Sequence, residues 1–233
     1  MLKVIHYDDL GHVNMGWLDA RYHFSFGRYV DRDRMGFGPI RVINDDIINP
    51  GTGFDLHEHK DMEIITYVRT GAIHHGDNLG NKGITRAGDV QVMSAGSGIH
   101  HSEAADPKEE TTLYQIWIKP REQGITPRWK QAEISKAPVT DQLNLLVSGF
   151  AADQDKGALY IHQHAAIYGG TIKAGTKLNQ EFPTSSLYIL ISEGSVQINN
   201  SPLCHKGDGV EITGDRNLNI IAETDSEILV IAI

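Results

Sequence analysis

Two short segments of the chain carry pairs of side chains that could bind one metal ion. His57 and His59 stand two residues apart in FDLHEH, and His101 and Glu103 stand two residues apart in IHHSE. Side chains along a β-strand alternate between its faces, so each pair projects from one face, with backbone positions roughly 6–7 Å apart. Two such strands facing one interior would bring three imidazoles and one carboxylate to a single ion.

Three neutral nitrogens and one oxygen suit Fe(II), Ni, Mn, Co, Cu or Zn, and not Ca or Mg. Four protein ligands leave two positions open on an octahedral ion, which is room for a substrate oxygen and O₂. Such an ion could activate an enol or hydroxyl group as a Lewis acid, and Glu103 could accept the proton. The pattern therefore favours metal-dependent chemistry with Glu103 as the catalytic residue.

The alternative is that these histidines bind no metal, because an isolated HxH pair in a β protein is more often two surface or packing histidines. Here the pair is followed in order by Glu63, Gly71, Gly88 and the HxE segment. That succession favours a metal site.

Other histidines make weaker candidates. His162 and His164 form a second HxH pair, but no HxE segment follows them, so we expect no native metal there. His74 and His75 are adjacent and must face opposite sides of a strand. One of them could orient a ligand, although a polar turn is the favoured location for both.

The sequence predicts that short β-strands position these side chains. β-Branched and aromatic runs recur between Gly, Asn, Asp and Pro, and the clearest are EIITYVRTG (63–71), DVQVMS (89–94), TLYQIWIK (112–119), LYILISEGSVQIN (187–199), GVEIT (209–213), LNIIA (218–222) and EILVIAI (227–233). Strands at this spacing, with turn residues between them, predict an all-β sandwich or barrel.

The two halves of the chain resemble imperfect copies. Gly71 aligns with Gly194, and the Gly-Asp pair that begins at Gly88 aligns with the pair that begins at Gly207. The repeated strand, turn and strand predict two tandem antiparallel barrels. In the second copy the four candidate ligands are replaced by Gln180, Phe182, Ile220 and Ala222. We therefore expect no metal in the second barrel.

The domain boundary is expected in GITPRWKQAEISKAP (124–138), which is polar, begins with Gly and Pro residues, and has room for a short helix. The predicted organisation is a metal-binding barrel over residues 1–130, a connector over 131–140, and a barrel without metal over 141–233.

Composition narrows the class of protein. The formal net charge of -9 disfavours direct binding of nucleic acid, which needs clustered positive charge. No stretch approaches the roughly 18 apolar residues of a membrane span, and no signal peptide is evident. The single cysteine, Cys204, suits a reducing compartment. These features predict a cytoplasmic protein that does not bind membranes.

The histidine segments resemble the cupin superfamily and, within it, the pirin family. The first cupin motif stands as G51-TGFDL-H57-E-H59-KDM-E63-IITYVRT-G71. The second, G88-DVQVMSAGSGIHHSE, has Ser94 where cupins usually have proline, and its AGSGIHHSE form is typical of pirins. The segments GHVNMGWLDARYHFSFGRYV (11–30), MGFGPIRVINDDIINPGTGF (35–54) and YQIWIKP (114–120) also resemble pirins. Two departures, Glu58 in place of a proline and Asn78 in place of a serine, touch no ligand.

The resemblance implies a bicupin with one metal, usually described as iron, held by His57, His59, His101 and Glu103. Some pirins open the flavonol quercetin with O₂, as a quercetin 2,3-dioxygenase does, and eukaryotic pirins are described as redox-sensitive transcriptional coregulators. Iron is thus the first expectation, with Ni, Mn, Co, Cu and Zn as alternatives. Glu63 occupies a place where many cupins have a ligand. With Glu103 present, we expect Glu63 either to orient a ligand or to support the structure.

Aromatic residues of the approach segment are candidates for an aromatic substrate pocket. Phe24, Phe26 and Phe37 could line it, or could instead plug the barrel or the domain junction. Gln115 and Trp117 share a face in YQIWIK, and either could approach the metal cavity.

Three functions fit the ligand set. The first is a dioxygenase that binds an aromatic enol such as a flavonol and directs O₂ to it. The second is a metal-loaded regulator that binds a protein partner, and the third is a metal-assisted isomerase or hydrolase, because one fold hosts several chemistries.

Overall fold

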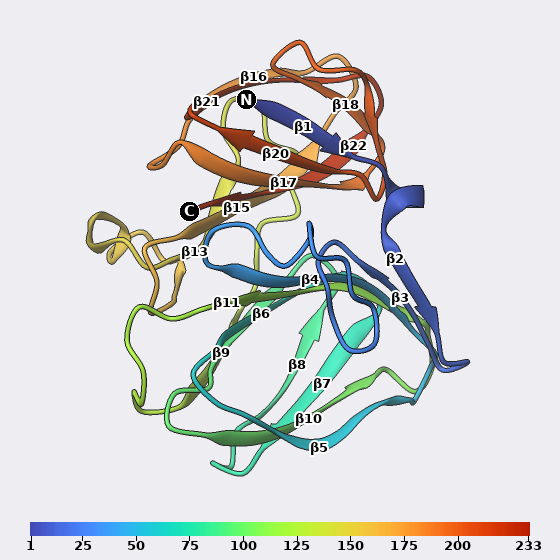
Figure 1. Ribbon diagram of the computed structural model, residues 1–233, viewed down its shortest axis with the longest axis vertical. Helices are drawn as coiled ribbons and strands as arrows, with labels where there is room; N and C mark the ends of the chain where they lie inside the picture. Colours follow the sequence, from blue (N-terminus) through green and yellow to red (C-terminus); the bar gives the residue numbers. More distant parts are fainter. The chain divides into compact units, whose positions relative to one another are not determined.

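The computed structural model describes residues 1–233, which form β-strands and two single-turn 3-10 helices, Tyr7–Asp9 and Ala151–Asp153. The chain divides into two compact units (Figure 1). The N-terminal unit comprises Gly11–Ser135 and Leu159–Gln163; the C-terminal unit comprises Met1–Leu10, Lys136–Ala158 and His164–Ile233. The prediction of two tandem all-β barrels is confirmed. Neither of the two single-turn helices could span a membrane.

Two antiparallel sheets form the N-terminal unit. The larger has the strand order β12-β9-β6-β11-β4-β3-β2, and the smaller has the order β5-β10-β7-β8. The strands of this unit are β2 (Gly11–Asn14), β3 (Leu18–Tyr22), β4 (Ile40–Ile48), β5 (Gly53–His59), β6 (Glu63–Thr70), β7 (Ala72–Asp77), β8 (Lys82–Arg86), β9 (Val90–Ser94), β10 (Ile99–Ala105), β11 (Thr111–Ile118), β12 (Arg128–Ala132) and β14 (Leu159–Tyr160).

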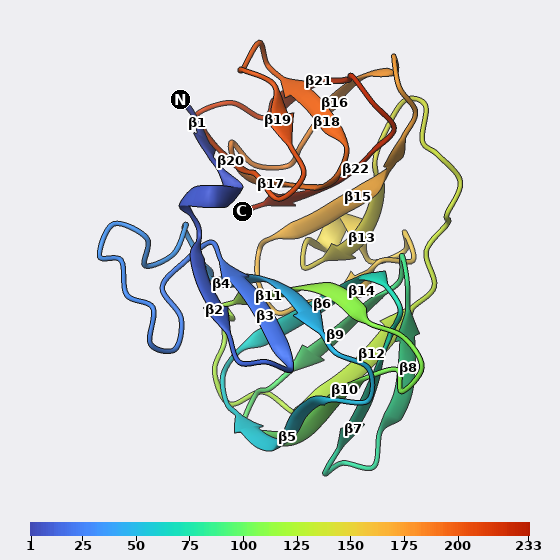
Figure 2. The same cartoon turned by 90° about the vertical axis from the view of Figure 1, so that its right-hand side faces the viewer.

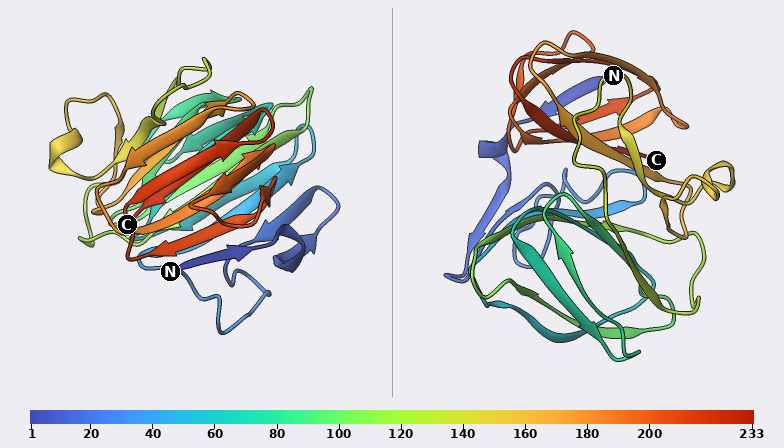
Figure 3. Two further views of the ribbon diagram at one scale, coloured as in Figure 1. Left: turned by 90° about the horizontal axis from the view of Figure 1, so that it is seen from above. Right: turned by 180° about the vertical axis from the view of Figure 1, so that it is seen from behind.

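The C-terminal unit repeats this topology. One sheet runs β1-β20-β17-β22-β15-β13, and the other runs β16-β21-β18-β19 (Figure 3, left, orange and red strands). Its strands are β1 (Leu2–Ile5), β13 (Asn144–Ser148), β15 (Ala166–Ile172), β16 (Lys177–Glu181), β17 (Ser186–Glu193), β18 (Ser195–Ile198), β19 (Cys204–His205), β20 (Gly209–Thr213), β21 (Asn217–Ala222) and β22 (Ser226–Ala232). The aligned turn glycines Gly71 and Gly194 have φ values of 69° and 76°. That left-handed backbone favours glycine at both positions.

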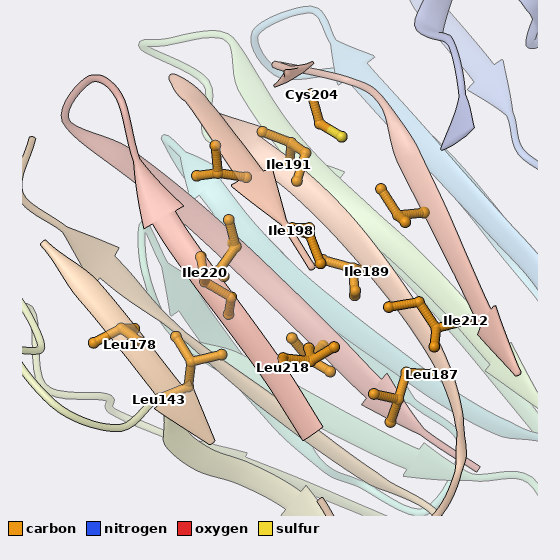
Figure 4. Close-up of a cluster of buried hydrophobic side chains, with 14 of the residues drawn as sticks. Leu143, Leu178, Leu187, Ile189, Ile191, Ile198, Cys204, Ile212, Leu218 and Ile220 are labelled. Atoms are coloured by element: carbon orange, nitrogen blue, oxygen red, sulfur yellow. The ribbon is translucent and has the colours of Figure 1, made fainter. Parts of the chain in front are cut away.

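The interior of the C-terminal unit is apolar. Leucine, isoleucine and valine side chains from both sheets fill it, with Cys204 at one end (Figure 4). Phe182, Ile220 and Ala222, which replace candidate ligands, belong to this core, and the Oε1 atom of Gln180 accepts the backbone N–H of Leu143. The side chains at the replaced positions therefore stabilise a packed core.

The N-terminal boundary differs from the prediction of a first domain over residues 1–130. Strand β1 pairs with β20 from Leu2↔Ile212 to Ile5↔Gly209, inside the C-terminal unit (Figure 2). Leu2 and Val4 pack against the apolar core of that unit. The strand covers an edge that would otherwise expose unpaired backbone groups.

The predicted connector also differs from the structure. Residues 128–132 form strand β12, which pairs with β9 from Arg128↔Ser94 to Ala132↔Val90, and no helix forms there. The segment follows the edge of β9 because its backbone groups complete the ladder and Trp129 packs on the interior side. The segment is thus part of the N-terminal barrel.

Deleting residues 1–10 should destabilise the C-terminal unit, because it removes the β1 ladder and uncovers apolar side chains. We expect a loss of about 3 kcal/mol in urea unfolding and concentration-dependent association through the open β20 edge. Lys3→Ala is the control, since this exposed side chain should matter little. An unchanged unfolding midpoint after the deletion would contradict this role for β1.

Candidate metal centre

Strands β5 and β10 bring three of the candidate ligands together. The strands are antiparallel neighbours in which His101 pairs with His57 and Ile99 pairs with His59. The ring centroids lie 4.5 Å apart for His57 and His101, 4.7 Å for His57 and His59, and 5.0 Å for His59 and His101. One nitrogen of each ring lies within 4.8 Å of the other two, a spacing at which three histidines could hold a metal ion.

Glu103 lies two residues beyond His101 on the same strand. The register of β10 against β5 shifts between these residues, which marks a bulge. Glu103 is buried, with 3% of its surface exposed. A carboxylate oxygen of Glu103 and one ring nitrogen each of His101 and His75 lie within 4.8 Å of one another. His57 and His59 form a separate group with His101. His101 is therefore common to both groups.

Two glutamines hold the Glu103 carboxylate. Gln115 donates from Nε2 to Oε2 at 2.5 Å, and Gln91 donates from Nε2 to Oε1. The orientation of each amide is set by an indole that donates to its oxygen: Trp117 to Gln115 at 3.1 Å and Trp129 to Gln91 at 3.3 Å. The carboxylate thus has a defined position without any cationic partner in its hydrogen bonds.

The environment of Glu103 disfavours its charge. Burial raises its pKa to about 7, against the opposing effect of hydrogen bonds from Gln115, Gln91 and Thr66. The carboxyl group therefore changes protonation near neutral pH. A bound cation would favour the ionised form.

His59 and His101 are neutral near pH 7 and could therefore act as ligands. Burial lowers the pKa of His59 to about 4, with a smaller effect of His57, and lowers the pKa of His101 to about 2, with smaller effects of the neighbouring histidines. The Nδ1 atom of His57 lies 2.7 Å from the carbonyl oxygen of Asp55 and donates to it, which leaves a lone pair on Nε2.

One unsatisfied buried atom indicates that the site could bind a metal ion. The Nε2 atom of His101 is buried and has no hydrogen-bond partner, although buried polar atoms are generally satisfied. It belongs to the imidazole that both groups share. Neutral imidazoles and one carboxylate are suitable donors for a divalent transition metal, so the residues present fit such an ion.

Two features of the site were missed in the sequence. Gln91 and Thr66 reach Glu103 from β9 and β6, and the signal was a polar residue at an inward position of an apolar strand. His75 was expected in a turn, but it lies in β7 with its side chain fully buried.

The predicted substrate-contact residues are distributed unevenly. Phe26 makes an edge contact with Trp117 at 5.4 Å between centroids, and Trp117 makes one with His59 at 4.8 Å, so aromatic rings extend from the histidines. Phe24 is buried beneath the guanidinium of Arg34. Phe37 is half-buried beside Ile40. Contacts of these residues and of Gln115 with a substrate stay predictions.

Polar groups continue into the barrel beyond Glu103. Asn44 and Asp46 lie on β4, where Asn44 pairs with Gln115 across the ladder and therefore shares its face. The Oδ1 atoms of Asn44 and Asp46 are buried without a hydrogen-bond partner. Burial, followed by the nearby Asp45 carboxylate, raises the pKa of Asp46 well above its ordinary value. This wall of the interior can accept hydrogen bonds from hydroxyl groups.

Two alternative candidates lie outside the centre. Glu63 is fully buried and accepts a hydrogen bond from the Ser94 hydroxyl at 2.8 Å, as expected for a structural residue. His162 packs edge-on against Tyr160, and His164 stacks near Phe150. Neither the glutamate nor this second HxH pair joins a group that could hold a metal.

Comparisons with known proteins point in one direction. The family model described as "Pirin" matches residues 4–118, and the one described as "Quercetinase C-terminal cupin domain" matches residues 145–233. A "Pirin-like protein" of Caulobacter vibrioides is 45% identical over 97% of this chain and 96% of that protein. The "Quercetin 2,3-dioxygenase" of Escherichia coli K12 is 42% identical over 95% and 94%. The crystal structure of the Escherichia coli bacterial pirin YhhW in complex with nickel(II) has a TM-score of 0.90 at 39% identity, covering 99% of this chain and 98% of that one.

Proposed function

The chain belongs to the pirin family, and from that premise we propose that it is a metal-dependent dioxygenase that opens an aromatic enol such as the flavonol quercetin with O₂. The proposed ligands are His57, His59, His101 and Glu103. The observation that carries the proposal is the buried, partnerless Nε2 atom of His101 beside two further imidazoles. The relatives named quercetin 2,3-dioxygenase support the substrate class.

The metal, when bound, would supply Lewis acidity toward the enol oxygen and redox chemistry toward O₂. Iron(II) is the proposed native ion. The nickel(II) complex of a similar pirin supports a site that accepts more than one metal. Metal analysis of protein purified without chelators or a histidine tag would decide between iron and Ni, Mn, Co, Cu or Zn.

The residues of the chain have distinct roles in this proposal. A carboxylate oxygen of Glu103 accepts the proton of the enol hydroxyl, and the O–H bond pair stays on the substrate oxygen as an enolate. Gln91 and Gln115 keep that carboxylate in place. Trp117 and Phe26 offer aromatic surfaces beside His59. Asn44 and Asp46 can accept hydrogen bonds from further phenolic hydroxyl groups.

Oxygen-dependent loss of the quercetin absorbance by the metal-loaded protein would test the proposal. We expect His59→Ala to reduce the rate to the uncatalysed level, because it removes a ligand. The matched control is His100→Ala, since this exposed histidine neighbours His101 on the opposite face of β10. Turnover that continued without O₂ would favour an isomerase or hydrolase. Metal-dependent capture of one protein partner without turnover would favour a regulator. Partner binding and the cytoplasmic location stay predictions.

A further inference from the structure

His75 is a buried histidine next to the proposed ligands, and it has no role in the proposed reaction. It lies on β7, pairs with Glu103 across the ladder to β10, and has a fully buried side chain. Its ring stacks flat on the indole of Trp129, with centroids 4.7 Å apart and planes 7° apart. The ring is therefore held in one orientation, with its two nitrogens facing two different partners.

The first partner of His75 is an acceptor. Its Nε2 atom lies 3.1 Å from Oδ2 of Asp77, whose side chain is also fully buried. Burial alone would raise the pKa of Asp77, but hydrogen bonds, led by those from Asn81 and His75, lower it below its ordinary value. An ionised carboxylate only accepts hydrogen bonds, so the proton of the neutral His75 ring is on Nε2 and its Nδ1 carries a lone pair.

The second partner of His75 is His101. The two Nδ1 atoms lie 3.5 Å apart, a long contact in which one ring must donate and the other accept. Because the Nδ1 atom of His75 carries the lone pair, His101 must donate from Nδ1. The lone pair of His101 is then on Nε2, the buried atom without a partner.

We propose that Asp77 and His75 are positioning residues that fix the tautomer of His101, with its proton on Nδ1 and its Nε2 free to bind the metal. Partners of this kind raise metal affinity by orienting the ligand ring and setting its tautomer. The inference rests on His101 as a proposed ligand and is independent of the flavonol chemistry. It also argues against any ion bound to Nδ1 of His101, because a proton occupies that atom.

Asp77→Asn tests the relay because the turn dictates how the new amide would lie. Oδ1 of Asp77 accepts the backbone N–H groups of Leu79 and Asn81, so the amide oxygen should take that place. The amide nitrogen would then face Nε2 of His75 as a donor. The proton of His75 would move to Nδ1, and His101 would respond by carrying its proton on Nε2, where it blocks the metal.

Two readouts on the full-length protein follow from this reversal. The ¹⁵N side-chain resonances of the metal-free protein should show His101 protonated on Nδ1 in the wild type and on Nε2 in Asp77→Asn, with the signal assigned by its loss in His101→Gln. Affinity for Ni(II) alone, measured against a competing chelator, should fall by about 10- to 100-fold. His75→Phe, which keeps the stacking on Trp129 without an acceptor, should show the same loss if Asp77→Asn does not fold.

The matched control is Asp106→Asn. Asp106 lies 3.6 Å from His74, the neighbour of His75 whose side chain is partly exposed, so this second His-Asp pair should leave Ni(II) affinity within about twofold. Unchanged affinity in both Asp77→Asn and His75→Phe, or a wild-type proton on Nε2 of His101, would each overturn the inference. A wild-type protein that bound no Ni(II) would instead refute the proposed ligand set, and the tautomer measurement would still judge the relay.

Discussion

Glu103→Gln is expected to weaken the pH dependence of metal binding near pH 7 and to slow turnover by about 100- to 10,000-fold, the range for loss of a general base. Metal binding requires the ionised carboxylate, and burial raises the pKa of Glu103 to about 7 in the metal-free protein. Wild-type affinity for Ni(II) should therefore fall roughly tenfold for each pH unit below 7 and level off above it. His59 and His101, with pKa values of about 4 and 2, stay neutral over pH 6–8.

The stability of the metal-free protein should change with pH in the opposite sense. Because the pKa of Glu103 is higher in the folded chain than in the unfolded chain, the unfolded state binds fewer protons between about pH 4.5 and 7. The contribution of this group to stability is thus complete below pH 4.5 and is lost as the pH rises to 7. The difference in unfolding free energy between wild type and Glu103→Gln should change by about 3 kcal/mol across that window.

Urea unfolding in the presence of a chelator, at pH 4.5 and pH 8, would measure this difference. Only the change between the two pH values is informative, because the amide that replaces the Glu103 carboxyl group meets the amide donors of Gln91 and Gln115 and lowers stability at every pH. If the gap between the two proteins were the same at both pH values, Glu103 would not titrate as its burial implies.

The four proposed metal ligands could be picked out in the sequence because their spacing is local. Side chains two residues apart on a strand lie on the same face. His57 could therefore be grouped with His59, and His101 with Glu103, without knowledge of the fold. The tandem barrels were predictable for a similar reason, since the turn after Gly71 recurs after Gly194 and both glycines adopt a positive φ.

The residues around the site meet through the register between strands that are distant in the sequence. Neither hydrophobic periodicity nor composition determines that register. Gln91 on β9 and Gln115 on β11 meet Glu103 only once three strands are aligned. The pairing of Leu2–Ile5 with β20 joins positions more than 200 residues apart. No local pattern in a four-residue strand distinguishes that partner from an edge of the nearer barrel.

Gly53→Ala should have the second large effect, because this glycine allows β5 to approach the backbone of β10 closely at Glu103 and Ala104. Gly53 pairs with Ala104. A Cβ atom at position 53 would overlap the carbonyl oxygen of Glu103 and lie 2.5 Å from the Cα atom of Ala104. These are backbone atoms, so relief requires the two strands to separate, which costs about 3 kcal/mol.

The separation would also move the histidine pair of β5 away from the pair on β10, so the same variant should lose most of its Ni(II) affinity. Gly76→Ala is the matched control on β7, the other neighbour of β10. A Cβ there would meet only the Ser102 hydroxyl, at an ordinary 3.7 Å, and the substitution should be neutral or slightly stabilising. Equal unfolding free energies and equal Ni(II) affinities for the two variants would mean that close approach at Gly53 does not hold the four ligands together.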